Sequence, residues 1–288
     1  MTETTKNYLL LHLVVVIFGF TGILGKLITI DAEQLVFWRA GIGGLVIMVW
    51  LALRGEITAK SPSTLLKMAG VGLIVAAHWI TFFASIKAST VSVALVMFAT
   101  APMFVGIIEP IVFRRNIDPR ELVISTIVLA GVGTIFSLDT DYQEGMILGI
   151  ISAFLAATFA TLNGVLVKQY DASNISMIEL LSASIGTGII LIFSGEFNSE
   201  MIYLSSTNWL WITLLAVVAT SFAFIVSTHV MKVLTPFTTA IAINLEPIYT
   251  IVIALIIFGE EEVMGPNFYL GASLIIGAVI INTIIKKK

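Results

Sequence analysis

The chain consists largely of apolar stretches of about 20 residues, the length at which a helix crosses a bilayer. We place them at residues 8–27, 34–53, 65–86, 91–113, 122–138, 146–167, 175–193, 209–230, 237–258 and 268–285. Only 11% of the 288 residues are charged, whereas a soluble domain has about 25%. The connectors are too short to hold a soluble domain. The sequence therefore predicts an all-α polytopic membrane protein with ten transmembrane helices.

The positive charges predict the orientation of these helices. Lys and Arg fall mainly in alternate connectors, such as 54–67 and 114–120, and at the C-terminal end, 286–288. The other connectors collect acids, as at 139–144 and 260–262. By the positive-inside rule the basic side faces the cytoplasm. We therefore expect a multi-pass protein with both termini cytoplasmic.

The two halves of the chain carry the same features at matching distances. Each half has a proline in the middle of an apolar stretch, Pro102 after Ala101 and Pro247 after Glu246. Eleven residues later each stretch ends at a phenylalanine, and fifteen residues before each proline stands a lysine. These residues are Phe113, Phe258, Lys87 and Lys232. We therefore predict two five-helix repeats, residues 1–141 and 142–288.

The odd number of spans in each repeat has a mechanistic consequence. Because five crossings end on the opposite side of the membrane, the second repeat is inverted relative to the first. Inverted halves of similar sequence can exchange conformations and open a central site to each side in turn. Such duplicated chains with broken mid-membrane helices are typical of secondary transporters.

Glu246 is the strongest candidate for a substrate-binding residue. It lies near the middle of its apolar stretch, where an ionisable group is costly and usually faces a cavity or a partner. Pro102 and Pro247 each remove a backbone donor, so we predict helix breaks or hinges that leave nearby carbonyls free. Two interpretations of Glu246 stay open. It binds a substrate amine or carries a coupling proton, or it is a hydrogen-bonded packing group.

His78 and Trp79 lie together near the middle of the third stretch and are predicted to contact substrate. Histidine titrates near neutral pH and can relay protons. The tryptophan ring offers a face to a cation or to an apolar substrate. The alternative is a core histidine bonded to a carbonyl, beside a packing aromatic residue.

Four further residues are candidates for substrate contact. Asn163, Asn244 and Thr100 are polar groups within apolar runs, where they either bond a substrate or join two helices. Tyr249 follows Pro247 and is placed to wall a cavity, with aromatic packing as the alternative. Together the polar mid-membrane residues put a cavity among the first, third, fourth, sixth, eighth and ninth stretches. The fifth and tenth have almost none and are expected at the periphery.

The remaining charges near the apolar stretches are expected to be structural. Arg39 lies toward the outer end of the second stretch, where we expect it to reach the interface or pair with a carboxylate. Glu109 is close to Arg114 and Arg115 and is expected to form an ion pair. The acidic run 260–262 is expected to be a solvated outer loop.

Several motifs occur in an order that indicates a family. They are Phe37-Trp38-Arg39-Ala40, Glu246-Pro247 and Phe258-Gly259-Glu260, with Gly131 and Gly277 in the last stretch of each half. In these features the chain resembles the EamA-type permeases of the drug/metabolite transporter superfamily. The resemblance implies a ten-helix carrier of the bacterial inner membrane that commonly exports amino acids or other small metabolites. The first half departs from the family in having two arginines after its phenylalanine.

Other classes of function lack their motifs. The chain has no cysteine, three scattered histidines, and neither a GxSxG nor an HExxH motif, so we expect no enzyme, no metal and no cofactor. We expect a small-molecule substrate and membrane lipid as partners, and no nucleic acid. A coupling proton and a homodimer stay open. The leading prediction is export of small metabolites such as amino acids by alternating access. The alternatives are export of hydrophobic amines or drugs, and translocation of a lipid.

Overall fold

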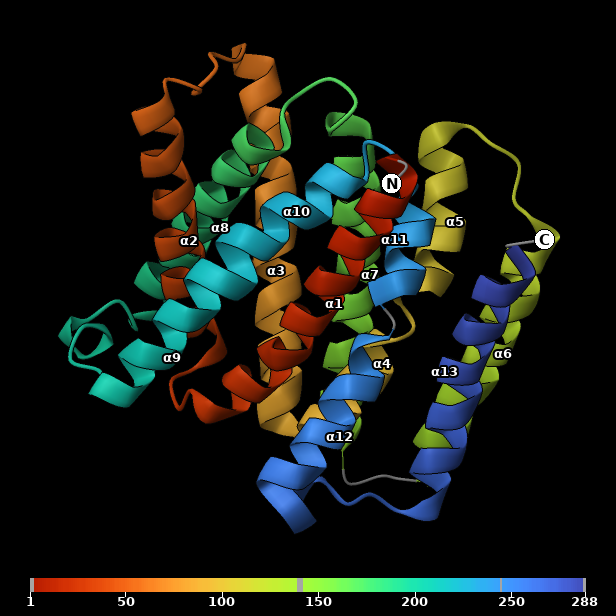
Figure 1. Cartoon of the computed structure of the whole chain (residues 1–288). Coiled ribbons are helices and arrows are strands. Elements are labelled where there is room, and N and C mark those ends of the chain that lie inside the picture. Colours follow the sequence, from red (N-terminus) through yellow and green to blue (C-terminus); the bar gives the residue numbers. More distant parts are fainter. Residues whose placement is uncertain (1–2, 139–141, 244, 287–288) are drawn as a thin grey trace.

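The computed structural model describes residues 3–138, 142–243 and 245–286, and its regular structure in these ranges is helical throughout (Figure 1). The first half forms α1 (Glu3–Leu27), α2 (Ala32–Arg54), α3 (Pro62–Ala88), α4 (Val91–Phe98), α5 (Ala101–Phe113) and α6 (Pro119–Leu138). The second half forms α7 (Gln143–Leu166), α8 (Ala172–Ser194), η1 (Ser199–Met201), α9 (Ser206–Ala216), η2 (Val217–Phe222), α10 (Ala223–Val230), α11 (Pro236–Ile243), α12 (Glu246–Phe258), η3 (Gly259–Glu262) and α13 (Pro266–Lys286). The all-α prediction is confirmed for the described residues.

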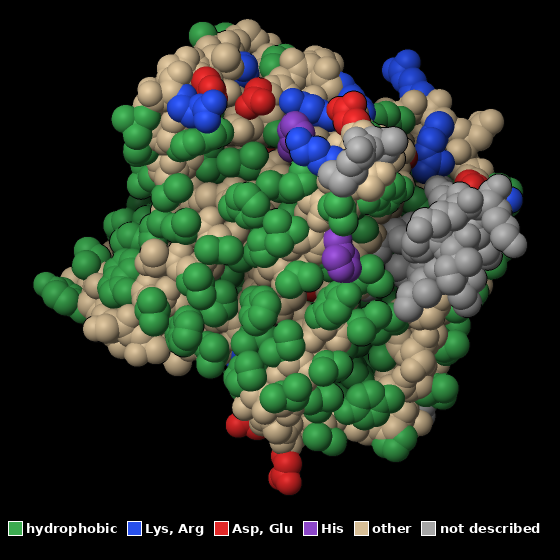
Figure 2. Space-filling view, viewed as in Figure 1, with side chains coloured by type: hydrophobic (Ala, Val, Ile, Leu, Met, Phe, Trp, Pro, Cys, Tyr) green, Lys and Arg blue, Asp and Glu red, His purple; other side chains and the backbone are tan. Residues whose placement is uncertain are grey.

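Seven segments of the described chain are long and apolar enough to cross a membrane, namely α1, α2, α3, α4–α5, α7, α8 and α9–α10. α11 and α12 are each too short alone, and the apolar part found in α6 is Val123–Ile135. The count of ten spans is therefore not confirmed and stays a prediction. Leu66, Phe193 and Ile256 are each at least three-quarters exposed, and apolar side chains cover the flank of the bundle (Figure 2). Such a surface suits lipid better than water.

Two of the apolar stretches are broken at the predicted prolines. α4 ends at Phe98 and α5 begins at Ala101, so Pro102 lies in the first turn of α5. α12 begins at Glu246 with Pro247 next to it. A proline is tolerated in the first turn because the N–H group there has no partner within the helix. The prolines thus begin new helices instead of kinking continuous ones.

The broken helices start in the same way in the two halves. Thr90 Oγ1 accepts a hydrogen bond of 3.1 Å from the backbone N–H three residues later, and Thr235 Oγ1 does the same. Gly22 of α1 packs against the first residue of α4, and Gly164 of α7 packs against the first residue of α11. These are the matches expected of a duplicated chain.

α6 and α13 form a pair at the edge of the bundle (Figure 1). They cross at two glycines. A Cβ on Gly131 would lie 2.9 Å from the backbone oxygen of Gly271, and one on Gly271 would lie 2.7 Å from that of Gly131. Small residues allow such close backbone approach between membrane helices. The prediction that the fifth and tenth stretches are peripheral is confirmed.

The rest of the bundle packs around α1, α3 and α7. α7 contacts α3, α4 and α5, while α8 packs on α2 and α3, and α1 packs on α10 and α12. Lys and Arg side chains, with some acids among them, gather at the end where α1 begins and α13 ends, whereas the charged side chains visible at the opposite tip beyond α12 are acidic (Figure 2). The two ends of the molecule therefore differ in charge, as the positive-inside pattern requires.

Gly72→Ala is expected to destabilise the protein by about 1–3 kcal/mol through overpacking. An added Cβ at position 72 of α3 would lie 2.4 Å from the backbone oxygen of Glu179 in α8. This oxygen cannot retreat unless α8 moves. Gly70→Ala in the same helix is the matched control, because its Cβ would meet nothing within 4 Å. Thermal unfolding in detergent measures both variants, and equal melting temperatures would contradict the close packing of α3 on α8.

Candidate functional site

A cavity of about 100 Å³ lies between helices of both halves. Its apolar wall combines six aromatic side chains with small and aliphatic ones, and the aromatic side chains are Phe18, Trp79, Phe82, Phe98, Phe159 and Phe224. Its polar lining consists of Thr21, Arg39, His78, Ser227, Thr239 and Glu246. A single water needs only about 10–15 Å³ measured in this way, so the space holds several waters or part of a small solute. The helices predicted to line a cavity do so, and α2 adds Arg39.

Glu246 is the only acidic side chain in the cavity lining. It is 4% exposed and begins α12, beside the break that follows α11. Among the described residues, none forms a hydrogen bond or an ion pair with its carboxyl group. The positive end of the α12 dipole favours a negative charge at this position. The carboxyl group is thus available to a cationic ligand or to a proton.

Arg39 brings a guanidinium group to the same cavity. Its Nε and Nη2 donate hydrogen bonds of 3.0 and 2.8 Å to Thr220 Oγ1. The guanidinium carbon lies 3.9 Å from the centre of the Trp79 ring, a cation–π distance. Nη1 is buried and has no partner among the described residues. The expectation that Arg39 reaches the interface or pairs with a carboxylate is wrong, because Thr220 and Trp79 hold it within the bundle.

The partner of Arg39 belongs to an irregular turn. Val217–Phe222 form a π-helical turn between α9 and α10. Thr220 Oγ1 donates to the Leu215 carbonyl and Ser221 Oγ to the Ala216 carbonyl, each five residues back and each at 2.9 Å. The wider turn leaves the lone pairs of Thr220 Oγ1 for the guanidinium of α2. π-Helical turns recur at functional sites because they redirect side chains in this way.

His78 and Trp79, both predicted substrate contacts, line the cavity from α3. His78 Nδ1 lies 3.0 Å from the Ser152 carbonyl and 2.9 Å from its hydroxyl, so α7 holds the imidazole. Its ring centre lies 5.4 Å from that of Phe159 and 5.5 Å from that of Phe98. The structure thus brings together three of the predicted contacts, Glu246, His78 and Trp79.

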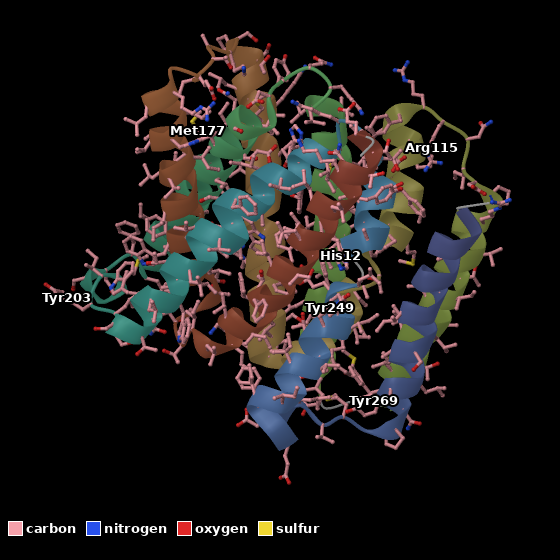
Figure 3. The ribbon with its side chains drawn as sticks, viewed as in Figure 1. His12, Arg115, Met177, Tyr203, Tyr249 and Tyr269 are labelled. Atoms are coloured by element: carbon pink, nitrogen blue, oxygen red, sulfur yellow. The ribbon has the colours of Figure 1, made fainter. Side chains whose placement is uncertain are left out.

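Three of the other predicted contacts, Thr100, Tyr249 and Asn163, are not part of this cavity lining. Thr100 Oγ1 donates to the Met97 carbonyl at 2.7 Å, within the turn between α4 and α5. Tyr249 is 40% exposed and its ring packs edge-on against His12 on the flank of the bundle (Figure 3). Asn163 is buried in α7, where it bonds Glu179 of α8. Asn244 lies outside the described residues.

A buried carboxylate ties the two halves together at the acidic end of the molecule. Glu262 accepts hydrogen bonds from the N–H groups of Val91 and Ser92 at 3.1 and 2.9 Å, and from the Ser92 hydroxyl at 2.7 Å. Lys26 Nζ lies 3.0 Å from the same carboxylate. The expectation of a solvated loop is wrong for Glu262, because the free N–H groups that begin α4 attract a carboxylate.

A second carboxylate ties the halves at the opposite end. Glu109 of α5 accepts a hydrogen bond of 2.8 Å from the N–H of Phe237, in the first turn of α11. Its other oxygen lies 3.3 Å from Arg115 Nε, so the predicted ion pair is confirmed. Glu262 of the second half therefore holds the start of α4, and Glu109 of the first half holds the start of α11.

Two buried charged residues are not predicted as site residues from the sequence. For Arg39 the sequence predicts the interface or a carboxylate partner, and no motif surrounds Glu179. The signal for Glu179 was present, since it is the one ionisable residue in the apolar run 175–193. An isolated charge in a membrane stretch marks a functional candidate even without a neighbouring motif.

These features define a class: a multi-pass helical membrane protein in which two like halves enclose a largely apolar cavity that holds a few polar and charged groups, the build of a membrane transporter. The chain belongs to the EamA-like transporter family, which matches residues 5–137 and again residues 143–284. The resemblance to EamA-type permeases is confirmed, and the family consists of transporters of small molecules and not of enzymes.

One similar solved structure, described only as "Crystal structure of protein", superposes on the chain with a TM-score of 0.74 at 13% sequence identity. The match covers 98% of this chain and 99% of that chain. At this identity the likeness shows a shared fold. No curated protein matches the chain.

Proposed function

We propose that the protein is a secondary transporter that exports small zwitterionic metabolites, with amino acids as the first candidates. The observation that carries this proposal is one cavity lined by an unpaired carboxyl group, Glu246, and by a guanidinium with an unpartnered nitrogen, Arg39. An amino acid presents the complementary groups. Its ammonium suits Glu246, and its carboxylate suits Arg39, whose planar fork matches carboxylate geometry.

The walls of the cavity supply the rest of the recognition. Ligand pockets are mostly apolar, with a few placed polar groups that orient the ligand. Here Trp79, Phe98, Phe159 and Phe224 line the cavity and offer apolar surface to a side chain, while Thr21, Ser227 and Thr239 add hydroxyl groups. This combination of two opposite charges within an apolar wall supports a zwitterionic substrate with an apolar side chain.

The proposed topology has ten spans arranged as two inverted five-helix repeats in the bacterial inner membrane. The matched breaks before Pro102 and Pro247 and the matched Thr90 and Thr235 caps support the duplication. The basic end of the bundle faces the cytoplasm by the positive-inside rule. Both termini then lie on the cytoplasmic side.

Transport by alternating access requires that the halves separate at one end at a time. The Glu262 contact joins them at the acidic, outer end, and the Glu109 contact joins them at the basic, inner end. Each is a set of charge-assisted hydrogen bonds between one carboxylate and a helix start, which can form and break as a unit. We assign them as the outer and inner closures, with Pro102 and Pro247 at the hinges.

A second candidate function is the export of hydrophobic amines. The aromatic wall and Glu246 suit an organic cation without help from Arg39. The two candidate functions differ in one requirement: the amino-acid exporter needs a carboxylate on its substrate, and the amine exporter does not.

An amino acid is expected to stabilise the detergent-purified protein against thermal unfolding. A ligand at 100 times its dissociation constant contributes about 2.7 kcal/mol to the native state. The panel comprises amino acids, amines lacking a carboxylate, nucleosides and sugars. Glu246→Gln is expected to abolish the shift, because the amide carries no charge for the ammonium. Glu260→Gln, at an exposed acid in η3, is the matched control and is expected to keep it.

The panel separates the candidates. Equal shifts with amines and amino acids would favour the second function. No shift with any soluble compound would contradict both and favour a lipid substrate.

A further inference from the structure

A buried acid outside the cavity carries a further inference. Glu179 lies in α8, is fully buried, and is not among the cavity-lining residues. Asn163 of α7 donates a hydrogen bond of 3.0 Å from Nδ2 to Glu179 Oε2. The substrate site proposed above does not use this pair.

Three polar atoms around this pair are buried without a partner among the described residues. They are Glu179 Oε1, Asn163 Oδ1 and Ser176 Oγ. Ser176 lies three residues before Glu179 and therefore shares its face of α8. Buried polar atoms are nearly always hydrogen-bonded, so the two unpartnered oxygens of the pair indicate that a hydrogen-bond donor is missing between them.

No neighbouring charge compensates a carboxylate at this position. α2, α3 and α10 pack against α8, and Asn163 reaches it from α7. The titratable and charged residues on these four helices are Glu33, Arg39, Arg54, Lys67, His78, Lys87, Glu144 and His229. In the described part of the chain, none of them forms a hydrogen bond or an ion pair with Glu179. An isolated buried carboxylate of this kind is strongly unfavourable.

A proton on Glu179 removes the uncompensated charge and also supplies a hydrogen-bond donor. When Glu179 is a neutral acid, its O–H becomes a donor, and the unpartnered Oδ1 of Asn163 is an acceptor for it. A carboxylic acid facing a primary amide can form two complementary hydrogen bonds, N–H to Oε2 and O–H to Oδ1. The amide of Asn163 already makes the first.

We propose that Asn163 and Glu179 form a proton-binding site, separate from the substrate cavity, that takes up and releases one proton in each transport cycle. The proposal rests on the transport function proposed above. Uptake converts the Glu179 carboxylate to the acid, and release returns the proton to water. The start of α8 carries polar side chains at Ser173, Asn174 and Ser176, and the helix begins roughly 10 Å along its axis from Glu179. It provides a path from the basic end of the bundle.

α7 links this site to the cavity. Asn163 lies one helical turn after Phe159 and Ala160, which line the cavity wall. On the other side, Gly72 holds α3 against the Glu179 backbone, and the same helix presents His78 and Trp79. A shift of α7 against α8 therefore changes the Asn163–Glu179 pair and the cavity wall together.

Two measurements on the full chain test the proposal. The first is infrared spectroscopy of the purified protein across a pH series. The C=O stretch of a protonated carboxyl group is expected near neutral pH in the wild type and in Glu246→Gln, and its Glu179 component is expected to be absent in Glu179→Gln. Asn163→Leu is expected to shift the pH at which this component disappears. Identical spectra for wild type and Glu179→Gln would show that Glu179 is not protonated and overturn the proposal.

The second measurement uses liposomes loaded with an isotope-labelled mixture of amino acids. Acidifying the outside is expected to accelerate wild-type efflux at least 10-fold. Glu179→Gln is expected to reduce efflux to the rate seen at equal pH, and Glu144→Gln, an exposed acid of α7, to keep the acceleration. Acceleration that survives in Glu179→Gln, or that follows a sodium gradient instead, would overturn the proposal. If no amino acid leaves wild-type liposomes, the proposed substrate class fails, while infrared spectroscopy still decides the proton site.

Discussion

Arg39→Lys is expected to lower amino-acid transport about 100-fold. The substrate carboxylate would lose a planar, two-pronged partner and meet a compact ammonium instead. Hydrogen bonds to charged groups contribute about 1.5–3 kcal/mol, and each 1.4 kcal/mol is a factor of about ten in affinity. Uptake and efflux of labelled amino acids in liposomes measure the loss. The matched control is Arg54→Lys, at an exposed arginine paired with Glu56, which is expected to transport normally.

A comparison of ligands with and without a carboxylate distinguishes a substrate-binding role of Arg39 from a structural one. If Arg39 binds this group, then binding of an amine that lacks a carboxylate is expected to be nearly unchanged in Arg39→Lys. A parallel loss for both compounds would assign Arg39 to packing and contradict its role in recognition. Thr220→Ser keeps the hydroxyl that orients Arg39 and is expected to retain transport. Thr220→Val removes this hydroxyl and is expected to weaken amino-acid binding.

Glu262→Ala is expected to destabilise the protein by about 3–5 kcal/mol, the usual cost of breaking a buried pair by removing one partner. The change leaves the N–H groups of Val91 and Ser92 without their acceptor, and Lys26 with only the exposed Glu261. Unfolding of the purified protein by heat or denaturant measures the effect. Glu260→Ala, two residues earlier and exposed, is expected to change stability by less than about 0.5 kcal/mol.

The comparison of Glu262 with Glu260 also tests the outer closure. Loss of the outer closure in Glu262→Ala is expected to favour the state that is open at the acidic end. A cysteine introduced beside the cavity measures this opening, because a reagent added on the acidic side of the membrane then labels it faster. If both alanine variants unfold at the same temperature, Glu262 does not join the halves, and its assignment as the outer closure is wrong.

Local pattern was sufficient for the helical class and for the duplication, although the count of ten spans stays a prediction. The apolar runs predict membrane helices because a bilayer demands about 20 apolar residues whatever the neighbours are. The breaks at Pro102 and Pro247 were predictable because proline acts on its own helix. Glu246, His78 and Trp79 were found for a similar reason, since a polar group in the middle of an apolar run is conspicuous in the sequence.

Contacts between residues far apart in the sequence explain why the predictions for Arg39, Glu262 and Tyr249 differ from the structure. Arg39 lies in the cavity because a π-helical turn, 181 residues away, aims Thr220 at it. Glu262 is buried because the start of α4, 170 residues away, offers free N–H groups to it. Tyr249 packs on His12 at the flank of the bundle and does not line the cavity. None of these outcomes has a signal within one helix.

The sequence by itself determined a duplicated, multi-pass helical membrane protein and three of the residues that line its cavity, Glu246, His78 and Trp79. Tertiary structure alone decided which of these residues share a cavity, which acids join the two halves, and that Asn163 faces Glu179. The physical reason is the range of the interactions. Hydropathy and proline act within one span, whereas hydrogen bonds and ion pairs between buried groups depend on how separate spans pack.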